Sequence, residues 1–405
     1  MTSMQVKQGW KKVNLSEIAR EFREPYSPNI DKDIPYLGLE HIEKNTLHIQ
    51  SIGSSSDTKS TKLRFKTNDI LFGKMRPYFR KIVRPKFDGV CSSEISVIRA
   101  LEKNDQNFIF YLVANNEFVD KISQTTQGTG MPRAKWEVMS KTKVKIPSPG
   151  VQQKIASILS AFDDLIENNT KRIKILENTD QLIYKEWFVN FKFPGHEKMK
   201  MVDSGTEFGK IPEGWEVKRV GEVADYIARG IAPKYDEAGD CLVINQRCIR
   251  NNHIDISLAR RNSKKINELK AILLGDVLIN STGVGTLGRV SQVYENYGTC
   301  TVDSHVTIVR PSACINMDYL GLSLFNLEST FEALGAGSTG QTELSRKSVE
   351  GVEMLSPPFE LQKRFSETVS PSRKQIVLAN NRNRHLSQTR DLLLPRLVGG
   401  EVEVD

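Results

Sequence analysis

The sequence predicts an α+β protein of two similar mixed α/β domains, separated by two long helices that pair as an antiparallel coiled coil with pseudo-twofold symmetry. Two observations carry this prediction. The chain of 405 residues resembles itself at a spacing of about 210 residues. Each copy also ends in a long segment whose apolar residues recur every seven positions, as they do in coiled coils.

Composition limits the class of protein. Hydrophobic residues make up 39% of the chain, and the formal net charge is +8 with a pI of about 9.1. This basic excess points to a polyanion or an acidic partner. The five cysteines form no CxxC pair and no apolar leader is present, so we expect reduced thiols in a cytoplasmic protein. No apolar run reaches the length of a membrane span, so no membrane contact is expected.

The internal repeat defines the domains. Residues 9–19 match 214–224, residues 67–82 align with 274–290, and residues 92–99 match 303–310. Runs such as ISVIR and VTIVR alternate β-branched and polar residues as strands do, and a helical pattern follows each of them. The predicted boundaries are 1–150 for the first domain, 151–192 for the central helix, 193–213 for a linker, 214–358 for the second domain, and 359–405 for the distal helix and tail.

The central helix is predicted from Gln152 to about Asn190, a segment without Pro or Gly. One position of its seam recurs every seven residues, and Ile158 and Leu165 are assigned to a second position three residues further on. Arg172 and Thr179 weaken that second position in the later half of the helix. The seam residues are Ile155, Phe162, Asn169, Leu176 and Ile183.

The distal helix is predicted over 360–398 and pairs with the central one. Pro371 is expected to mark a break near its start, and Pro395 limits its end. Asn383 falls on its seam as Asn169 does on the first, where a buried Asn fixes register at a cost in stability. The alternative is that each helix packs separately on its own domain. The remaining seam residues are Val369, Ile376, Leu386, Leu393 and Leu397.

Basic residues concentrate between Lys59 and Lys86, where Asp69 is the only acid and Tyr78 and Phe79 are interleaved. Mobile positive charge of this kind contacts phosphates, and Arg also grips guanine bidentately. The alternative is a solvated basic surface. The candidate DNA contacts of the first domain are Lys74, Arg76, Tyr78, Arg80, Lys81, Arg133 and Lys135.

The second copy keeps the framework and changes the loops, which are polar rather than charged. That difference is expected if each domain reads a different half-site, because base readout depends on side-chain identity. The candidate DNA contacts of the second domain are Ser281, Thr282, Thr286, Arg289, Thr339, Gln341 and Arg346.

Two motifs suggest an enzyme. GVGTLG at 283–288 fits a dinucleotide or S-adenosylmethionine loop, and SPPF at 356–359 resembles a tetrapeptide of amino-methyltransferases. The residues after the first motif read as a strand rather than a helix, and the first copy has no equivalent of either. The histidines and cysteines form no metal-ligand spacing, and no P-loop is present. We therefore predict no catalytic residue and no metal.

Several segments together resemble one family. They are IPYLGLEHIE, TNDILFGKMRPYFRKI, the stretch from MPRAKW to IPSPGVQQKIASILSAFDDLIENN, and GKIPEGWEV at the start of the second copy. The chain resembles the DNA specificity subunit of Type I restriction–modification enzymes over essentially its whole length. The resemblance implies two target-recognition domains that read a bipartite, asymmetric DNA sequence, with the paired helices as a spacer between them.

The resemblance also implies partners. Two methyltransferase subunits would carry S-adenosylmethionine and methylate adenine at N6, and two motor-nuclease subunits would use ATP and Mg. This chain would bind double-stranded DNA and no cofactor. Two alternatives stay open: a self-contained S-adenosylmethionine-dependent DNA methyltransferase, supported by the two motifs above, and a scaffold that joins proteins without binding DNA.

Overall fold

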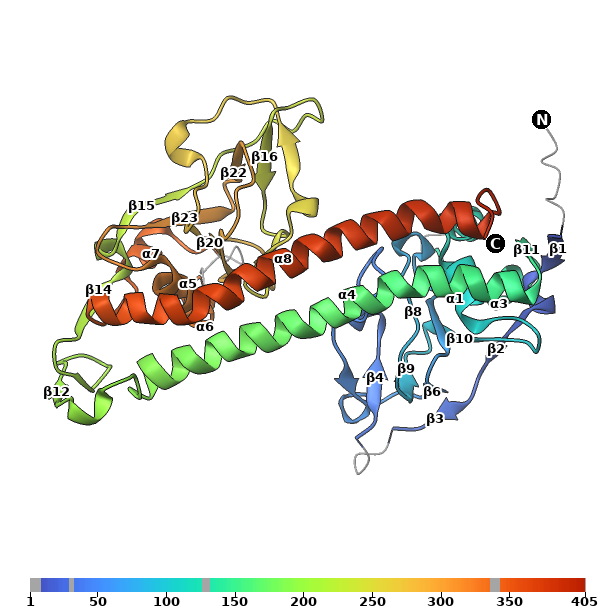
Figure 1. Ribbon diagram of the computed structural model, residues 1–405, viewed down its shortest axis with the longest axis horizontal. Coiled ribbons are helices and arrows are strands. Elements are labelled where there is room, and N and C mark those ends of the chain that lie inside the picture. Colours follow the sequence, from blue (N-terminus) through green and yellow to red (C-terminus); the bar gives the residue numbers. More distant parts are fainter. Residues whose placement is uncertain (1–8, 29–32, 126–131, 336–342, 405) are drawn as a thin grey trace. The chain divides into compact units, whose positions relative to one another are not determined.

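The computed structural model describes residues 9–28, 33–125, 132–335 and 343–404. The chain divides into two units. Unit 1 comprises Met1–Asn169 and Arg382–Asp405, and unit 2 comprises Thr170–Asn381. Each unit contains one globular head and one part of each long helix (Figure 1).

Among its described residues, the head of unit 1 contains two main sheets and three α-helices. A four-stranded antiparallel sheet has the order β2 (Ala19–Phe22), β10 (Ile95–Ala100), β7 (Ile70–Gly73), β8 (Ile82–Val83). A five-stranded sheet has the order β3 (Pro25–Tyr26), β6 (Lys62–Phe65), β9 (Gly89–Cys91), β4 (Pro35–Leu37), β5 (Gly53–Ser54). A further pair joins β1 (Lys11–Asn14) to β11 (Lys143–Ile146), and the helices are α1 (Gln106–Ala114), α2 (Asn116–Gln124) and α3 (Trp136–Met139).

The head of unit 2 repeats this plan. Its four-stranded sheet has the order β15 (Ala224–Arg229), β23 (Val306–Pro311), β20 (Val277–Asn280), β21 (Val290–Gln292). The other strands are β19 (Arg260–Asn262), β16 (Cys241–Ile244) and β22 (Cys300–Val302) in one sheet, β17 (Ile249–Arg250) with β18 (His253–Ile254), and β14 (Glu216–Arg219) with β24 (Glu353–Ser356). The helices are α5 (Met317–Phe325), α6 (Glu328–Leu334) and α7 (Arg346–Gly351).

The long helices are α4 (Pro149–Tyr184), which ends in a π-helical turn at Lys185–Val189, and α8 (Phe359–Val398). They pair in both units. In unit 1, Asn169 Nδ2 donates to Asn383 Oδ1 over 2.9 Å. In unit 2, Ile173 packs with Ile376 and Ala379. The predicted α+β class, with two similar domains and paired long helices, is therefore confirmed, and separate packing of each helix is wrong.

The seam of α4 differs from the prediction at its second position. Ile158 and Leu165 are 37% and 51% exposed, whereas Leu159, Ile166 and Ile173 are 0%, 4% and 9% exposed. The second position thus lies four residues after the first, not three. Apolar residues stand at both places early in the helix, so their periodicity did not distinguish the two frames. Four residues predicted for the first seam position or for the distal helix are buried: Ile155, Val369, Ile376 and Leu397. The others are partly buried: Phe162, Asn169, Leu176, Ile183, Asn383, Leu386 and Leu393.

The predicted break at Pro371 is also wrong, because α8 continues through it and through Pro395. Both prolines are exposed, so their rings occupy the solvent side of the helix. Each removes one backbone hydrogen bond. Packing on the other side, where Val369 and Arg373 are 0% and 5% exposed, holds the helix together around Pro371.

The segment predicted as a linker has structure of its own. It contains the strands β12 (Met201–Asp203) and β13 (Lys210–Pro212), which form an antiparallel pair. Phe193 and Ile211 are 6% and 3% exposed and belong to the core of unit 2. The glycines and charges of this segment suggested a flexible connection, and its few apolar residues anchor it instead.

Glu177 on α4 gives unit 2 a pH-dependent stability. Burial raises the pKa of this carboxyl to about 7, Arg373 lowers it and Asp180 raises it further. An acid whose pKa rises on folding disfavours the folded state once it ionises, so stability falls as the pH increases from about 4.5 to 7. We expect Glu177→Gln to raise the melting temperature of unit 2 at pH 8 by a few degrees and to leave it nearly unchanged at pH 4.5. Melting curves at both pH values, with exposed Glu367→Gln on α8 as the control, measure this, and equal shifts for the two variants would contradict it.

Candidate nucleic-acid interface

In unit 1, the loop from Lys74 to Lys81 joins β7 to β8 at the edge of the four-stranded sheet. Three backbone hydrogen bonds hold its start: Lys74 donates to Glu94 (2.8 Å), Ala134 donates to Lys74 (2.8 Å), and Arg76 donates to Pro132 (2.9 Å). The sheet edge therefore brings together three segments that are far apart in the sequence. We call residues 74–81, 94 and 133–135 the unit-1 loop cluster.

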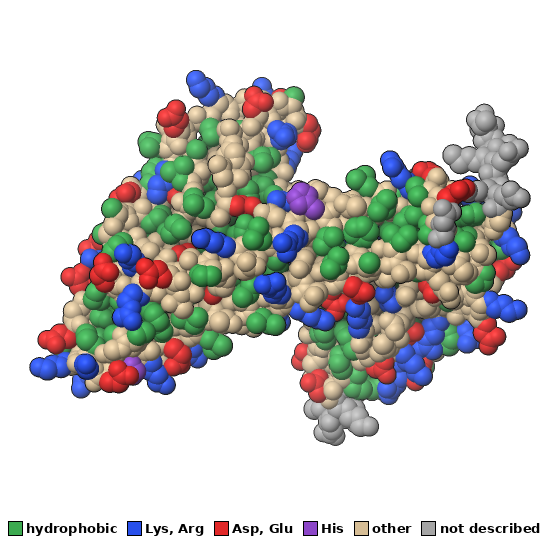
Figure 2. All heavy atoms as spheres, in the orientation of Figure 1, with side chains coloured by type: hydrophobic (Ala, Val, Ile, Leu, Met, Phe, Trp, Pro, Cys, Tyr) green, Lys and Arg blue, Asp and Glu red, His purple; other side chains and the backbone are tan. Residues whose placement is uncertain are grey.

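Charges of both signs meet in this cluster. Arg133 Nη2 lies 2.6 Å from Glu94 Oε1, and the arginine side chain remains 47% exposed. Burial lowers the pKa of Lys74, while the nearby Glu21 and Glu94 raise it and Arg133 lowers it. Two of the predicted contacts, Lys74 and Arg133, thus lie together, and Glu94 orients the guanidinium beside them. Figure 2 shows that Lys and Arg side chains gather over the unit-1 head on the face in view.

Arg80 and Lys81 are engaged within the head. Arg80 Nη2 donates to the carbonyl of Ala114 at the end of α1 (2.8 Å), and Lys81 Nζ donates to the carbonyl of Leu39. Burial lowers the pKa of both side chains. Both residues are only partly exposed, so their first role is to fix the loop rather than to meet a ligand.

The tip of the loop is more open. Arg76 is exposed and its backbone is left-handed, with φ of 49°. Tyr78 is 47% exposed, with its ring edge-on to Phe79 at 4.8 Å. Lys135 is also exposed, directly before α3. The Arg76 guanidinium also lies over the Phe79 ring, 5.8 Å from its centre. These three side chains are more exposed than Arg80 and Lys81, and they are able to reach a polyanion.

The loop of unit 2 is held by two backbone hydrogen bonds equivalent to those of unit 1. Ser281 donates to the carbonyl of His305 (2.8 Å), and Leu344 donates to that of Ser281 (2.8 Å). Thr282 forms an isolated β-bridge with Glu343, and Met75 forms the equivalent β-bridge with Arg133 in unit 1. The backbone arrangement at this edge of the sheet is therefore the same in both units, but the side chains differ. Glu343 takes the place of Arg133, and His305 takes the place of Glu94. We call residues 281–289, 305 and 343–346 the unit-2 loop cluster.

Ser281 does not fit a ligand contact. Its side chain is fully buried, and its hydroxyl lies 2.6 Å from that of Thr307. The residue follows β20, a strand whose side chains are buried on both faces of the sheet, which the sequence pattern did not show. Thr282 is better placed, because it is partly exposed and its hydroxyl lies 2.8 Å from Nδ1 of the exposed His305.

The other predicted DNA contacts of unit 2 differ in how far their side chains already interact within the protein. The Thr286 hydroxyl donates a hydrogen bond to the carbonyl of Thr282 (3.3 Å), and Nη2 of Arg289 donates one to the carbonyl of Gly285 (2.7 Å). Both side chains therefore stabilise the loop. Burial lowers the pKa of Arg289. Arg346 is 62% exposed and pairs with Glu350 one turn along α7 (2.6 Å). The predicted contacts Thr339 and Gln341 lie outside the described residues.

The match to a family model decides what kind of protein this is. The model described as "Type I restriction modification DNA specificity domain" matches residues 7–178 and again 212–388. The chain belongs to this family. Its two matches correspond to the two copies of the internal repeat, so each head belongs to a specificity domain.

Relatives over most of the chain have the same description. The chain is 27% identical over 303 residues to the Type I restriction enzyme MjaIX specificity subunit of Methanocaldococcus jannaschii, covering 74% of this chain and 69% of that protein. It is 24% identical to the HindI specificity subunit of Haemophilus influenzae, over 97% and 99% of the two chains. A solved Type I S subunit from M. genitalium has the same fold, with a TM-score of 0.59, 15% identity and coverage of 98% and 97%.

The structure explains the GVGTLG motif of the second specificity domain without a cofactor. Gly283, Gly285 and Gly288 all have positive φ, at 107°, 69° and 82°, which other residues rarely adopt. The strand β21 follows, not the helix that would place its N-terminus at a phosphate. Neither the motif nor the family therefore favours a self-contained methyltransferase.

Three residues of the loop clusters were missed by sequence reasoning: Glu94, His305 and Glu343. A signal existed for the first two, because the alignment of 92–99 with 303–310 places Glu94 opposite His305. Among the described residues, no group of His, Cys, Asp or Glu is arranged to hold a metal ion. In the same part of the chain, no helix is both long and apolar enough to cross a bilayer.

Proposed function

We propose that this protein is the DNA-reading subunit of a Type I restriction–modification enzyme, and that each loop cluster contacts one half of a bipartite, asymmetric target. One observation carries the proposal. Two equivalent backbone hydrogen bonds hold both loops, while the side chains at equivalent positions differ in charge: unit 1 has Arg133 and Glu94, and unit 2 has Glu343 and His305. A shared scaffold with different side chains suits two domains that read different bases.

The chain itself would make and break no covalent bond. Its family is defined by DNA specificity. We therefore assign adenine N6 methylation and cleavage to partner subunits, two methyltransferases with S-adenosylmethionine and two motor-nucleases with ATP and Mg. The paired helices would serve as the spacer between half-sites, and the complex would work in the cytoplasm, where its DNA lies.

Methylation mapping tests this proposal. The chain is expressed with and without the methyltransferase subunits of its own system in cells that lack other adenine methyltransferases, and methylated adenines are located by single-molecule sequencing. We expect one asymmetric, two-part motif with a fixed gap, and only when the partners are present. Methylation by this chain alone would instead support the self-contained methyltransferase, and binding to neither specific nor random duplex DNA would support the protein scaffold.

Arg76 provides a test of the division of labour between the two heads. We expect Arg76→Ala to weaken binding at the first half-site by roughly tenfold to a hundredfold, because a lost bidentate base contact costs about 1–3 kcal/mol. Discrimination at the second half-site should be unchanged. Competition binding with duplexes altered in one half-site at a time measures both effects. Exposed Lys143→Ala on β11 is the control, and an equal loss at both half-sites would contradict the assignment.

A further inference from the structure

Two buried ion pairs join the long helices, one in each unit. In unit 1, Nη1 of Arg390 lies 2.6 Å from Oδ1 of Asp163, and the arginine side chain is 1% exposed. In unit 2, Nε of Arg373 lies 2.9 Å from Oδ2 of Asp180, with side chains 6% and 1% exposed. The N–H of Arg373 is not aimed at that oxygen, so the contact is ionic rather than an aligned hydrogen bond. Both acids are on α4 and both arginines are on α8.

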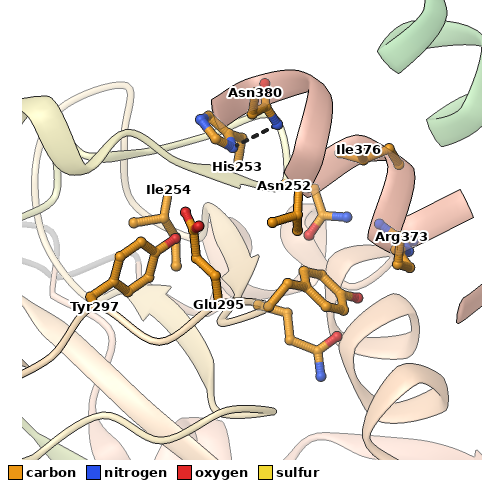
Figure 3. Close-up of a pocket in the computed structure, with 11 residues that line it drawn as sticks. Asn252, His253, Ile254, Glu295, Tyr297, Arg373, Ile376 and Asn380 are labelled. Atoms are coloured by element: carbon orange, nitrogen blue, oxygen red, sulfur yellow. Dashed lines mark hydrogen bonds between the residues drawn. The ribbon is translucent and has the colours of Figure 1, made fainter. Parts of the chain in front are cut away.

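In each unit a hydroxyl group also donates a hydrogen bond to the aspartate of the ion pair. Tyr111 donates to Asp163 over 2.6 Å, and the hydroxyl of Ser372 donates to Asp180. In unit 2, Arg373 and Asn380 of α8 also line a pocket with His253, whose Nδ1 lies 3.4 Å from Nδ2 of Asn380 (Figure 3). The ion pairs are therefore built into the helix junctions rather than left on the surface.

The repeat relates the two pairs to each other. Gln152 and Gln362 stand at equivalent places about 210 positions apart. Gln152 Oε1 accepts from the backbone of Asp105 over 3.0 Å, and Gln362 Oε1 accepts from that of Asn316 over 2.9 Å. In this alignment Asp163 corresponds to Arg373, and Asp180 corresponds to Arg390. The two copies therefore carry opposite charges at both equivalent positions.

This reversal affects what each helix can pair with. If a second α4 took the place of α8, Asp163 would face the Asp180 of the other copy at both junctions. If a second α8 took the place of α4, Arg373 would face Arg390. Like charges that are buried and close repel strongly. In a self-pair Asp163 would keep the hydrogen bond from Tyr111 and Arg390 would keep its contact with Asp391, but each would lose the opposite charge across the junction. Only the pairing of α4 with α8 places an acid against a base at both junctions.

The C-terminal ends of α4 and α8 also differ, in the size and type of the side chains that enter the two cores. Tyr184 and Phe188 at the end of α4 belong to the core of unit 2, where the Phe188 ring lies 4.6 Å from that of Tyr319. The equivalent residues of α8, Leu394 and Val398, belong to the core of unit 1. Exchanging aromatic for aliphatic side chains would overpack one core and leave a cavity in the other.

We propose that the two halves of this chain are matched to each other by these ion pairs, so that the N-terminal half accepts the C-terminal half and rejects the same half of a second copy. The partner surface that each long helix recognises is thus one of opposite charge at the two junction positions. Buried ion pairs contribute little net stability, and selection of the correct partner helix is the use that best explains them here. The repeat architecture would otherwise permit symmetric assemblies of one half with itself.

The test cuts the full chain after it has folded. A protease site is inserted in the loop at Ser204–Gly209 between β12 and β13, and the purified protein is cleaved, unfolded in urea and refolded by dilution. Native mass spectrometry then counts the assemblies. We expect the wild-type halves to re-form only the mixed pair. Self-pairs of either half in this wild-type sample would overturn the proposal, whatever the variants do.

The decisive variant is Asp180→Arg/Arg373→Asp. It keeps an acid–base match at both junctions of the mixed pair, and it also creates a match in each self-pair. We expect self-pairs of both halves to appear as a minor fraction beside the mixed pair, which the aromatic and aliphatic ends of the helices still favour. If only the mixed pair forms, the charges do not discriminate and the proposal fails.

The matched control inverts all four charges with Asp163→Arg/Asp180→Arg/Arg373→Asp/Arg390→Asp. Each half again carries like charges, so we expect only the mixed pair. Self-pairs in this control would show that substitution itself loosens the selection, and would overturn the proposal. Circular dichroism before cleavage shows which variants fold. If the charge-swapped proteins do not, Asp180→Asn/Arg373→Gln replaces them, and the absence of self-pairs from that variant would likewise refute the role of charge.

Discussion

Arg390→Ala is expected to be among the most destabilising single substitutions in unit 1, at about 3–5 kcal/mol of unfolding free energy. The side chain is 1% exposed and its guanidinium contacts Asp163, Asp391 and the carbonyl of Thr46. Removing it leaves the Asp163 carboxylate partly buried beside Tyr111 without its counter-charge. The cost arises from this uncompensated charge and from the volume lost at the helix junction.

Urea denaturation of the full chain, followed by tryptophan fluorescence, measures this effect. Trp10 and Trp136 pack against the core of unit 1 and report on it. Arg382→Ala, at an exposed position on the same helix, is the control and should change stability by less than about 0.5 kcal/mol. The double variant Asp163→Leu/Arg390→Met should recover much of the loss, since a buried pair replaced by apolar groups is often neutral. Similar midpoints for Arg390→Ala and Arg382→Ala would show that the ion pair is not buried in solution.

Gly288→Ala is expected to abolish recognition of the second half-site while leaving the first intact. Gly288 has φ of 82°, and a Cβ there would lie 2.7 Å from the backbone nitrogen of Glu332 and 2.8 Å from the carbonyl oxygen of Glu328. Neither atom can give way without moving α6. The substitution therefore combines left-handed strain with a backbone clash, and it displaces the loop that carries Thr282 and Arg289.

Gly285→Ala is the matched control. Gly285 lies in the same loop with φ of 69°, but a Cβ there meets nothing within 4 Å. It should cost only the strain of a left-handed residue, about 1 kcal/mol, and leave half-site preference unchanged. The methylation pattern of the partner-bound protein reports both results. Equal effects of the two substitutions would show that the loop does not depend on its packing against α6.

The repeat and the heptad periodicity were enough to predict the architecture from the sequence, because both are properties of many residues at once. Single positions were harder. Leu159 and Ile158 are both apolar, so only the partner helix determines which of them is buried. The π-helical turn and the hairpin after α4 depend on a few anchors such as Phe193, which no periodicity reveals.

The candidate interface shows the same limit. The run of basic residues predicted where positive charge would meet a polyanion, and this stays a prediction. It did not show that Arg80 and Lys81 turn inward to backbone carbonyls, because that depends on how the loop folds back on α1 and η2 (Leu39–His41). Ser281 and Thr282 are adjacent polar residues of similar size, and only the end of strand β20 determines that the first faces the core and the second faces solvent.

The anchored segment after α4 determines where recognition domains from different parents can be joined. Tyr184, Phe188, Phe193 and Ile211 all belong to the core of the second head, although they precede the family match that begins at residue 212. A chimera whose junction lies in 193–213 would build that core from two parents. Junctions at Asn169 in α4 and Asn381 in α8 transplant each head together with every helix segment that packs on it, and they are the breakpoints at which new specificities should be assembled.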